Sequence, residues 1–273
     1  SMPLPYYWHH LPSEALSPFV DRYWGWEIPF SAALPMLMPG TGSECFFHFS
    51  SPPRLYSGQI LPESYLVCPR HQITRFLPAE QLRFIAIRFK NGQLRHFTHC
   101  PFMELQDSLP PLTTVWGYAA EALYEQLLNT ASRDEQIHHI EQFLLSRLRR
   151  HHTETNSRLD QLMEQIYYAP NHRIDRWAGQ SGWSQRQLER LFKNRFALTP
   201  KRFARLARLH HTLRQISLQP TQELLDIALE RGFSDQPHFN HEIQTFTGMT
   251  PGELQPLLRQ QLHYYNPPSR TPE

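Results

Sequence analysis

The chain has 273 residues, enough for two domains with cores of their own, and its 40% hydrophobic and 19% charged residues are typical of a globular protein. It contains no run of 18 apolar residues and no opening apolar segment with a basic flank, so the sequence predicts neither a membrane span nor a signal peptide. Its three cysteines are too few for a dense disulfide framework, and we expect a reduced, cytoplasmic setting.

Residues 1–110 are predicted to form short strands broken by proline and glycine. Residues 44–49 make an apolar run of strand length, and residues 82–89 form a second strand that ends at the turn Lys90-Asn91-Gly92. Residues 115–128 then carry apolar side chains at helical spacing, and Ser132 with Glu135 predicts the capping box of another helix. We therefore expect an α+β sensory and association domain over residues 1–150, β-barrel-like with a helical hairpin, followed by a polar linker at residues 151–156.

The first 49 residues are rich in aromatic side chains, which either line a pocket in this domain or, as is commoner, form its core. If a pocket exists, we expect Glu44, His48 and Arg88 to converge on it and bind a small-molecule effector. Cys45-x2-His48 resembles a pair of zinc ligands, but strand positions three apart point to opposite faces. Cys68-x2-His71 supplies two ligands at most, so neither a metal site nor a cofactor is expected.

The C-terminal part contains the same helix-turn-helix pattern twice, 50 to 51 residues apart. Ala178 and Ala228 stand where two helices approach closely, and four residues later Gly182 and Gly232 supply the turn. The remaining paired features are a helix cap, an apolar anchor and a closing Thr-Pro: Ser184 and Asp235, Leu188 and Phe239, Thr199-Pro200 and Thr250-Pro251. Two copies in register predict two DNA-reading units in one domain.

These motifs resemble those of the AraC/XylS family of bacterial transcription regulators. The matching residues are Leu188-x2-Leu191-Phe192-Lys193, Leu198-Thr199-Pro200, and residues 232–239 and 248–251. The resemblance covers about residues 157–262 and implies an all-α DNA-binding domain of seven helices there, in which a central helix joins the two units; residues 263–273 remain as a tail. It further implies double-stranded DNA and RNA polymerase as partners. The strands and helices of residues 1–150 are similar in order to the sensory domain of many family members.

The chain departs from the family pattern at both reading helices. Ala197 stands where the first unit usually has glycine, so it must adopt a positive φ, at roughly 1 kcal/mol, or use another cap. His241, Ile243 and Gln244 replace the usual arginine, aromatic residue and lysine of the second unit. The second reading helix has therefore lost its permanent positive charges.

The first reading helix is expected to run from Ser184 to about Arg195 with a polar, basic face. The predicted DNA-contacting residues on that face are Gln185, Arg186, Glu189, Arg190 and Lys193. Arg186 and Arg190 lie one helical turn apart and can each hold guanine through two hydrogen bonds, while Glu189 can accept from cytosine or hold an arginine. The resemblance assigns base contacts to Arg186, Glu189 and Arg190. A solvated basic helix face is the alternative.

The charge is divided unequally between the units. Residues 157–215 hold 12 Lys/Arg against 4 Asp/Glu, whereas residues 216–262 hold 2 against 6. We expect phosphate contacts from Lys201, Arg202 and Arg205 of the central helix, or else a solvated charged face. The predicted contacts of the second unit are Gln236, His238, Asn240 and His241, which either read bases or leave this unit a structural one.

The sequence therefore predicts a sequence-specific DNA-binding transcription regulator that responds to an effector. The alternative is a sensory or interaction protein whose second DNA-binding unit has weakened and which works through a partner. A wide apolar stripe on residues 135–149 suits a homodimer contact, unless one chain buries all of it. No phosphate loop, nucleophile elbow or HExxH motif points to an enzyme.

Overall fold

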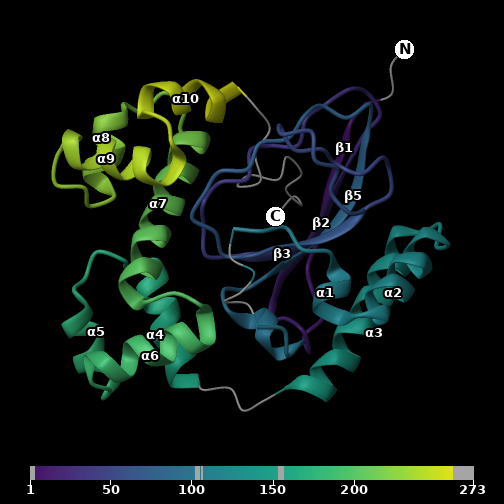
Figure 1. Ribbon diagram of the computed structural model, residues 1–273, viewed down its shortest axis with the longest axis horizontal. Coiled ribbons are helices and arrows are strands. Elements are labelled where there is room, and N and C mark those ends of the chain that lie inside the picture. The colour runs from purple at the N-terminus through teal and green to yellow at the C-terminus, as the bar shows by residue number, and fades with distance from the viewer. Residues whose placement is uncertain (1–3, 102–104, 106, 153–156, 261–273) are drawn as a thin grey trace.

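The computed structural model describes residues 4–101, 105, 107–152 and 157–260. Two domains lie side by side, one built on a β-sheet and one entirely helical (Figure 1). The predicted tail at residues 263–273 and most of the predicted linker lie outside the described residues. No helix in the described part of the chain combines the length and apolar character needed to cross a membrane.

The N-terminal domain contains a five-stranded antiparallel sheet in the order β1-β2-β5-β3-β4. The strands are β1 (Tyr6–His10), β2 (Val20–Ile28), β3 (Ser43–His48), β4 (Ser64–Val67) and β5 (Leu82–Phe89). The strands predicted at residues 44–49 and 82–89 are thereby confirmed as β3 and β5. The sheet is open, with β1 and β4 at its edges, so the expected barrel is only loosely realised. The proline-rich segments between strands pair through single bridges, such as Leu37 with Thr74, and do not extend the sheet.

The two faces of this sheet are buried in different ways. Helices α1 (Leu112–Trp116), α2 (Tyr118–Leu128) and α3 (Arg133–His151) cover one face and bury Cys45 and Ile87. The irregular segments between strands cover the other face, where Trp24, Phe46 and their neighbours form an aromatic core. Cys45 and His48 point to opposite faces as predicted, since the His48 ring stacks on Phe46. Most of the aromatic residues at positions 1–49 are therefore core, among them Trp24, Trp26 and Phe46, whereas Tyr6 at the edge strand is exposed.

The helical hairpin differs from its prediction at one point. The single helix expected at residues 115–128 is broken into α1 and α2 at Gly117, whose φ of 60° and ψ of −144° no helix can accommodate. Of the predicted capping box of α3, the structure shows the bond to the cap residue, in which the Ser132 hydroxyl accepts from the Glu135 backbone N–H at 3.3 Å. The apolar stripe of α3 faces inward, with Ile140 and Leu144 fully buried in the same chain. A homodimer contact through this stripe remains a prediction, and little of the stripe's apolar surface is exposed to form it.

The helical domain has the seven helices that the resemblance implies. They are α4 (Ser157–Tyr168), α5 (Ile174–Ser181), α6 (Gln185–Phe196), α7 (Pro200–Leu218), α8 (Leu224–Glu230), α9 (Gln236–Thr247) and α10 (Pro251–Gln260). The pairs α5–α6 and α8–α9 form the two helix-turn-helix units, and α7 runs between them (Figure 1). The predicted anchors Leu188 and Phe239 are both buried in the common core. The repeated sequence pattern is thus a repeated structure.

The local features of the two units follow from their turn and cap residues. Gly182 and Gly232 have φ angles of 78° and 88°, a region in which glycine is not strained. The Ser184 hydroxyl accepts from the Gln187 backbone N–H at 3.2 Å. The Gln187 side-chain oxygen accepts from the Ser184 backbone N–H at 2.9 Å, and the two bonds form a capping box. Asp235 caps α9 by accepting from the His238 N–H at 2.8 Å. Ala197 adopts the positive φ considered above, at 60°.

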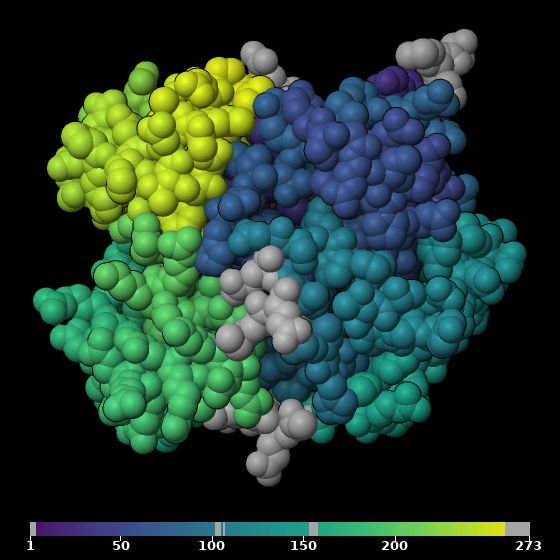
Figure 2. All heavy atoms as spheres, viewed as in Figure 1, coloured from purple at the N-terminus to yellow at the C-terminus, as the bar shows by residue number. Residues whose placement is uncertain are grey.

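On the face that Figure 2 shows, the helical domain, green to yellow, lies against the N-terminal domain. Met38, from the segment between β2 and β3, is buried in the core of the helical domain. Arg95, in the short 3-10 turn η1 (Gln93–His96), forms an ion pair of 2.7 Å with Asp160 of α4, and both side chains are largely buried. Apolar and ionic contacts together therefore fix how the sheet domain sits on the helical domain.

Candidate nucleic-acid interface

Helix α6 of the first unit has a buried apolar face and, opposite it, an exposed polar face. Leu188, Phe192 and Phe196 are buried, which fixes the rotation of the helix about its axis. Four predicted contact residues are exposed on the opposite face, and one, Glu189, is half-buried; the exposed ones are Gln185, Arg186, Arg190 and Lys193. A capped helix with exposed arginines near its N-terminus has the shape and charge that a major groove accepts.

The second unit presents a less uniform face on α9. Gln236, Asn240 and His241 are exposed, whereas His238 is half-buried. The Nδ1 atom of His238 lies 3.3 Å from the backbone nitrogen and 3.2 Å from the hydroxyl of Ser234, and its ring packs against Phe233. His238 therefore braces the turn between α8 and α9, and the other three side chains remain available to a partner.

The central helix α7 holds its cations in different surroundings. Lys201 is exposed, but Arg202 is half-buried and donates from Nε to Nδ1 of His71 in the N-terminal domain at 2.9 Å. Arg205 donates two hydrogen bonds of 3.0 Å to the carboxylate of Glu242 on α9. Of the three predicted phosphate contacts, only Lys201 thus points to solvent with no partner described for it.

Glu242 is the buried polar residue that the sequence analysis missed. Its side chain is 4% exposed and accepts from Arg205 and, at 3.4 Å, from Arg208. Burial raises the pKa of Glu242, but the hydrogen bonds and charges of the two arginines outweigh it and hold the pKa below its ordinary value. It is the sole acid in α9, opposite arginines spaced by three on α7, and this pattern is the signal that could have found it.

The residues proposed for effector binding are not all brought together. Glu44 and Arg88 form an ion pair of 2.8 Å, and the Trp24 indole donates to the same carboxylate oxygen at 2.9 Å. His48 lies four residues further along β3, beyond Phe46, and is fully buried, with Nε2 3.0 Å from the Tyr65 hydroxyl. Burial lowers the pKa of His48 to about 3, so its ring is neutral.

Glu44 and Arg88 line a cavity of about 890 Å³ that lies between the two domains. The helical domain contributes Tyr167 and His210, and burial, with the neighbouring His211 and arginines, lowers the pKa of His210 to about 3. A volume of this size suits a small organic molecule. The sequence could not place this cavity, because its walls depend on how the domains pack against each other.

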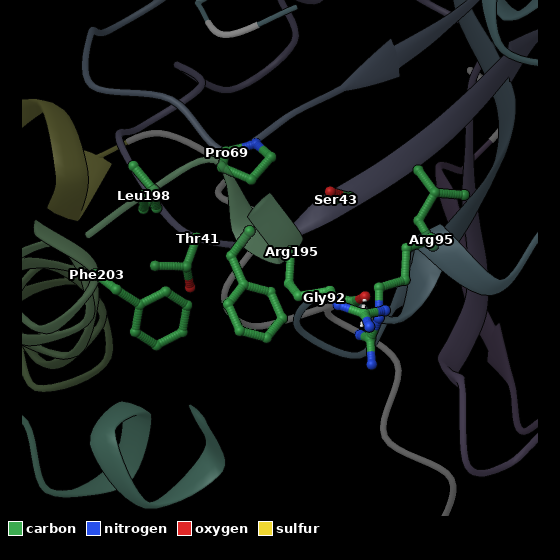
Figure 3. A pocket seen from close by; sticks show the side chains of 10 residues that line it. Thr41, Ser43, Pro69, Gly92, Arg95, Arg195, Leu198 and Phe203 are labelled. Atoms are coloured by element: carbon green, nitrogen blue, oxygen red, sulfur yellow. Dashed lines mark hydrogen bonds between the residues drawn. The ribbon is translucent and has the colours of Figure 1, made fainter. Parts of the chain in front are cut away.

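A second, much smaller cavity of about 30 Å³ lies where the N-terminal domain touches the end of α6. Gly92 and Arg95 line it from one domain, and Phe196 and Phe203 from the other (Figure 3). Arg95 folds back to donate to the Gly92 carbonyl at 2.6 Å, and its guanidinium lies 5.7 Å from the centre of the Phe196 ring. The space holds about one water, so this is a packed contact.

Two protein-family models match the chain. Residues 177–256 match a helix-turn-helix domain, and residues 8–111 match a domain of unknown function, DUF6597. The first match begins within α5 and includes α6, the central helix α7, and α8 and α9 in full.

Two transcription regulators are each similar to between a quarter and a third of this chain. The HTH-type transcriptional regulator ArgR of Pseudomonas aeruginosa is 39% identical over 70 residues, which are 26% of this chain and 21% of ArgR. The HTH-type transcriptional activator RhaR of Klebsiella pneumoniae is 33% identical over 81 residues, which are 29% of this chain and 28% of RhaR. The chain thus spans about a quarter of the length of these relatives.

Among solved structures, ToxT from Vibrio cholerae is similar over both domains. One ToxT structure has a TM-score of 0.48 at 12% identity and covers 86% of this chain and 96% of its own. Another, with an unsaturated fatty acid bound, has a TM-score of 0.45 at 14% identity and covers 88% and 96%. A likeness this distant does not extend to function.

Proposed function

We propose that this chain, which belongs to the AraC family of helix-turn-helix transcription regulators, binds specific sequences of double-stranded DNA and controls transcription from them. The observation that carries the proposal is the capped helix α6, which presents Arg186 and Arg190 to solvent above buried anchors. The surplus of eight positive charges over residues 157–215 supplies the field that draws DNA to this face. A cytoplasmic location belongs to the same proposal, because the DNA of a bacterial cell lies in its cytoplasm.

The test is selection of DNA from a random pool by the full chain, followed by binding of single variants to the selected site. Arg186→Ala or Arg190→Ala should weaken binding by about 1–3 kcal/mol and relax the preference at one base position. Arg149→Ala is the matched control, because Arg149 is exposed on α3 of the other domain. A loss that is equal on all sequences would show that these arginines contact phosphate and would refute the assignment.

We propose that the second unit reads bases through Gln236 and Asn240 while adding little to phosphate binding. Both side chains are exposed on α9, and residues 216–262 carry a net charge of −4. Changing them to alanine should alter the selected sequence and leave the salt dependence of binding nearly unchanged. An equally strong effect on the salt dependence would contradict this division of labour.

We also propose that a small-molecule effector binds in the cavity between the domains. Both domains contribute to its walls, so a bound molecule changes the stability of their contact and hence the placement of the DNA-reading units. A metabolite that binds there should raise the melting temperature of the wild type but not of Arg88→Ala, with Arg149→Ala again as the control. An equal rise in all three proteins would locate the ligand elsewhere.

RNA polymerase is the further partner expected from the family, and a homodimer is the expected assembly. Sedimentation of the full chain at tens of micromolar tests the assembly, since a monomer at that concentration would remove the homodimer. The rival is an interaction protein with a weakened second unit. It predicts that selection returns a site read by α6 alone.

A further inference from the structure

We propose that Glu242 is a positioning residue for DNA recognition, which fixes the second reading helix at a set angle to the central helix. The inference rests on the proposed function, since it concerns how the two units divide one DNA site. The Glu242 carboxylate lies in α9, beneath the exposed side chains that face a partner, and is bound by two arginines of α7. It does not itself reach the surface, because its side chain is 4% exposed.

The geometry of this contact is directional. The Arg205 guanidinium meets the Glu242 carboxylate with Nε on one oxygen and a terminal nitrogen on the other, both at 3.0 Å. Such a fork-to-fork pair constrains the orientation of both groups, whereas the apolar contacts of Phe239 and Ile243 constrain mainly distance. Arg208, one turn further along α7, binds the same carboxylate at 3.4 Å. Two points on α7 therefore hold one point on α9.

A second contact holds α9 one turn further on. The guanidinium groups of Arg202 and Arg205 lie 4.7 Å and 5.1 Å from the centre of the Phe246 ring, four residues after Glu242. Arg208 in turn lies 4.4 Å from the centre of the Phe233 ring in the turn that precedes α9. The arginines of α7 thus engage the turn before α9 and two successive turns of the helix itself, which resists both tilting and rotation.

This arrangement assigns Arg205 a role other than phosphate binding. Its Nε and one of its two terminal nitrogens donate to Glu242, and the guanidinium lies 5.1 Å from the centre of the Phe246 ring. If the Arg205 guanidinium left this carboxylate for phosphate, the buried Glu242 would keep only the longer contact of 3.4 Å with Arg208, which is unfavourable for a buried charge. Exposed Lys201 at the start of the same helix carries no such constraint.

A fixed angle matters because the two units must fit one DNA duplex together. Units that read successive segments of a major groove are about 34 Å apart along the duplex, and one added base pair moves a segment by about 3.4 Å and rotates it. A rigid pair of units therefore binds only sites with one distance between the two DNA segments. A second unit that is loosely held can shift and still bind its segment when that distance changes. Loss of the clamp should appear as loss of spacing selectivity.

The experiment uses the full chain and the DNA site that the wild type selects. Sites carrying one or two inserted base pairs between the segments contacted by the two units are compared with the uninterrupted site. The wild type should lose about tenfold or more in affinity on each insertion. Glu242→Gln should lose less than about threefold, and so should Arg205→Lys, which keeps the charge but not the fork. Glu253→Gln, an exposed acid of α10, is the matched control and should behave as the wild type.

The outcomes separate the inference from its alternatives. If Glu242→Gln melts at a lower temperature but keeps the wild-type penalty on insertions, Glu242 only stabilises the fold and the inference is wrong. If Arg205→Lys keeps the penalty, as a phosphate contact would, it is wrong as well, and this arm holds even where Glu242→Gln fails to fold. A wild type that selects a site but tolerates insertions overturns the inference alone. A wild type that selects no sequence overturns the proposed function too.

Discussion

Replacement of Gly92 by alanine should loosen the contact between the two domains. Gly92 follows β5 with φ of 74° and ψ of −2°, in the left-handed region. A Cβ atom at this position would lie 2.5 Å and 2.8 Å from two ring carbons of Phe196 and 3.1 Å from the sulfur of Met163. Phe196 ends α6 and is buried, so its ring has little room to move away.

The expected loss has two parts that a matched variant separates. An L-residue in the left-handed region costs about 1–2 kcal/mol, and forcing a methyl group into a packed contact costs about a further 1–3 kcal/mol. Gly248 has almost the same backbone conformation, with φ of 71° and ψ of 5°, but no heavy atom lies within 4 Å of its would-be Cβ. Gly248→Ala therefore bears only the first part, and the difference between the variants should be about 1–3 kcal/mol.

Denaturation by urea measures both free energies of unfolding, and calorimetry adds a second readout. Because the contact joins the domains, Gly92→Ala should also split one heat-capacity peak into two, whereas Gly248→Ala should keep the wild-type shape. Equal losses in the two variants would mean that Phe196 and Met163 give way without cost. The close packing of the domain contact would then have no energetic weight.

Three further predictions concern single residues. Ala197→Gly should raise the free energy of unfolding by about 0.5–1 kcal/mol in urea denaturation, since Ala197 has a φ of 60°; an unchanged or lower value would show that the position is unstrained. The pKa of His48 is about 3 in the folded chain and about 6.5 in the unfolded chain, so below pH 6.5 only the unfolded chain binds the extra proton. The free energy of unfolding should therefore fall by about 1 kcal/mol per pH unit as the pH drops below about 6.5. His48→Gln should flatten that dependence in melting curves between pH 7.5 and 5.5, and parallel curves would exclude His48 as its source. Lys201→Gln should reduce the salt dependence of DNA binding by about one phosphate contact, whereas an unchanged slope would place Lys201 away from DNA.

The features that the sequence predicts well are those set by a few neighbouring residues. The capping box of Ser184 and Gln187 needs only four positions, and the strand at residues 82–89 needs only its own apolar pattern. The break at Gly117 was missed because an isolated glycine is tolerated inside a helical pattern, and its φ and ψ depend on how α1 and α2 each pack against the sheet. The open sheet likewise depends on which strands find partners across the chain.

In the candidate site, too, the features set by neighbouring residues are predictable from the sequence, and those set by contacts between distant segments are not. The exposed face of α6 follows from helical periodicity once Leu188 is recognised as its anchor. The pair of Glu242 and Arg205 joins residues 37 positions apart on two helices, and no local pattern sets their distance. Glu44 and Arg88 do meet, but in a cavity closed by the second domain, whereas His48 fills the aromatic core.

The position of Met38 affects whether the N-terminal domain of this protein could be exchanged for that of a relative. This side chain is 4% exposed and belongs to the sheet domain by sequence, but it lies in the hydrophobic core of the helical domain, against which Met36 and Ile73 also pack. A hybrid that joined this helical domain to an unrelated sensory domain would leave a side-chain-sized void in that core. Recombination between relatives is therefore constrained. A hybrid that keeps this DNA-binding domain must also keep the segment around Met38, although more than a hundred residues separate the two along the chain.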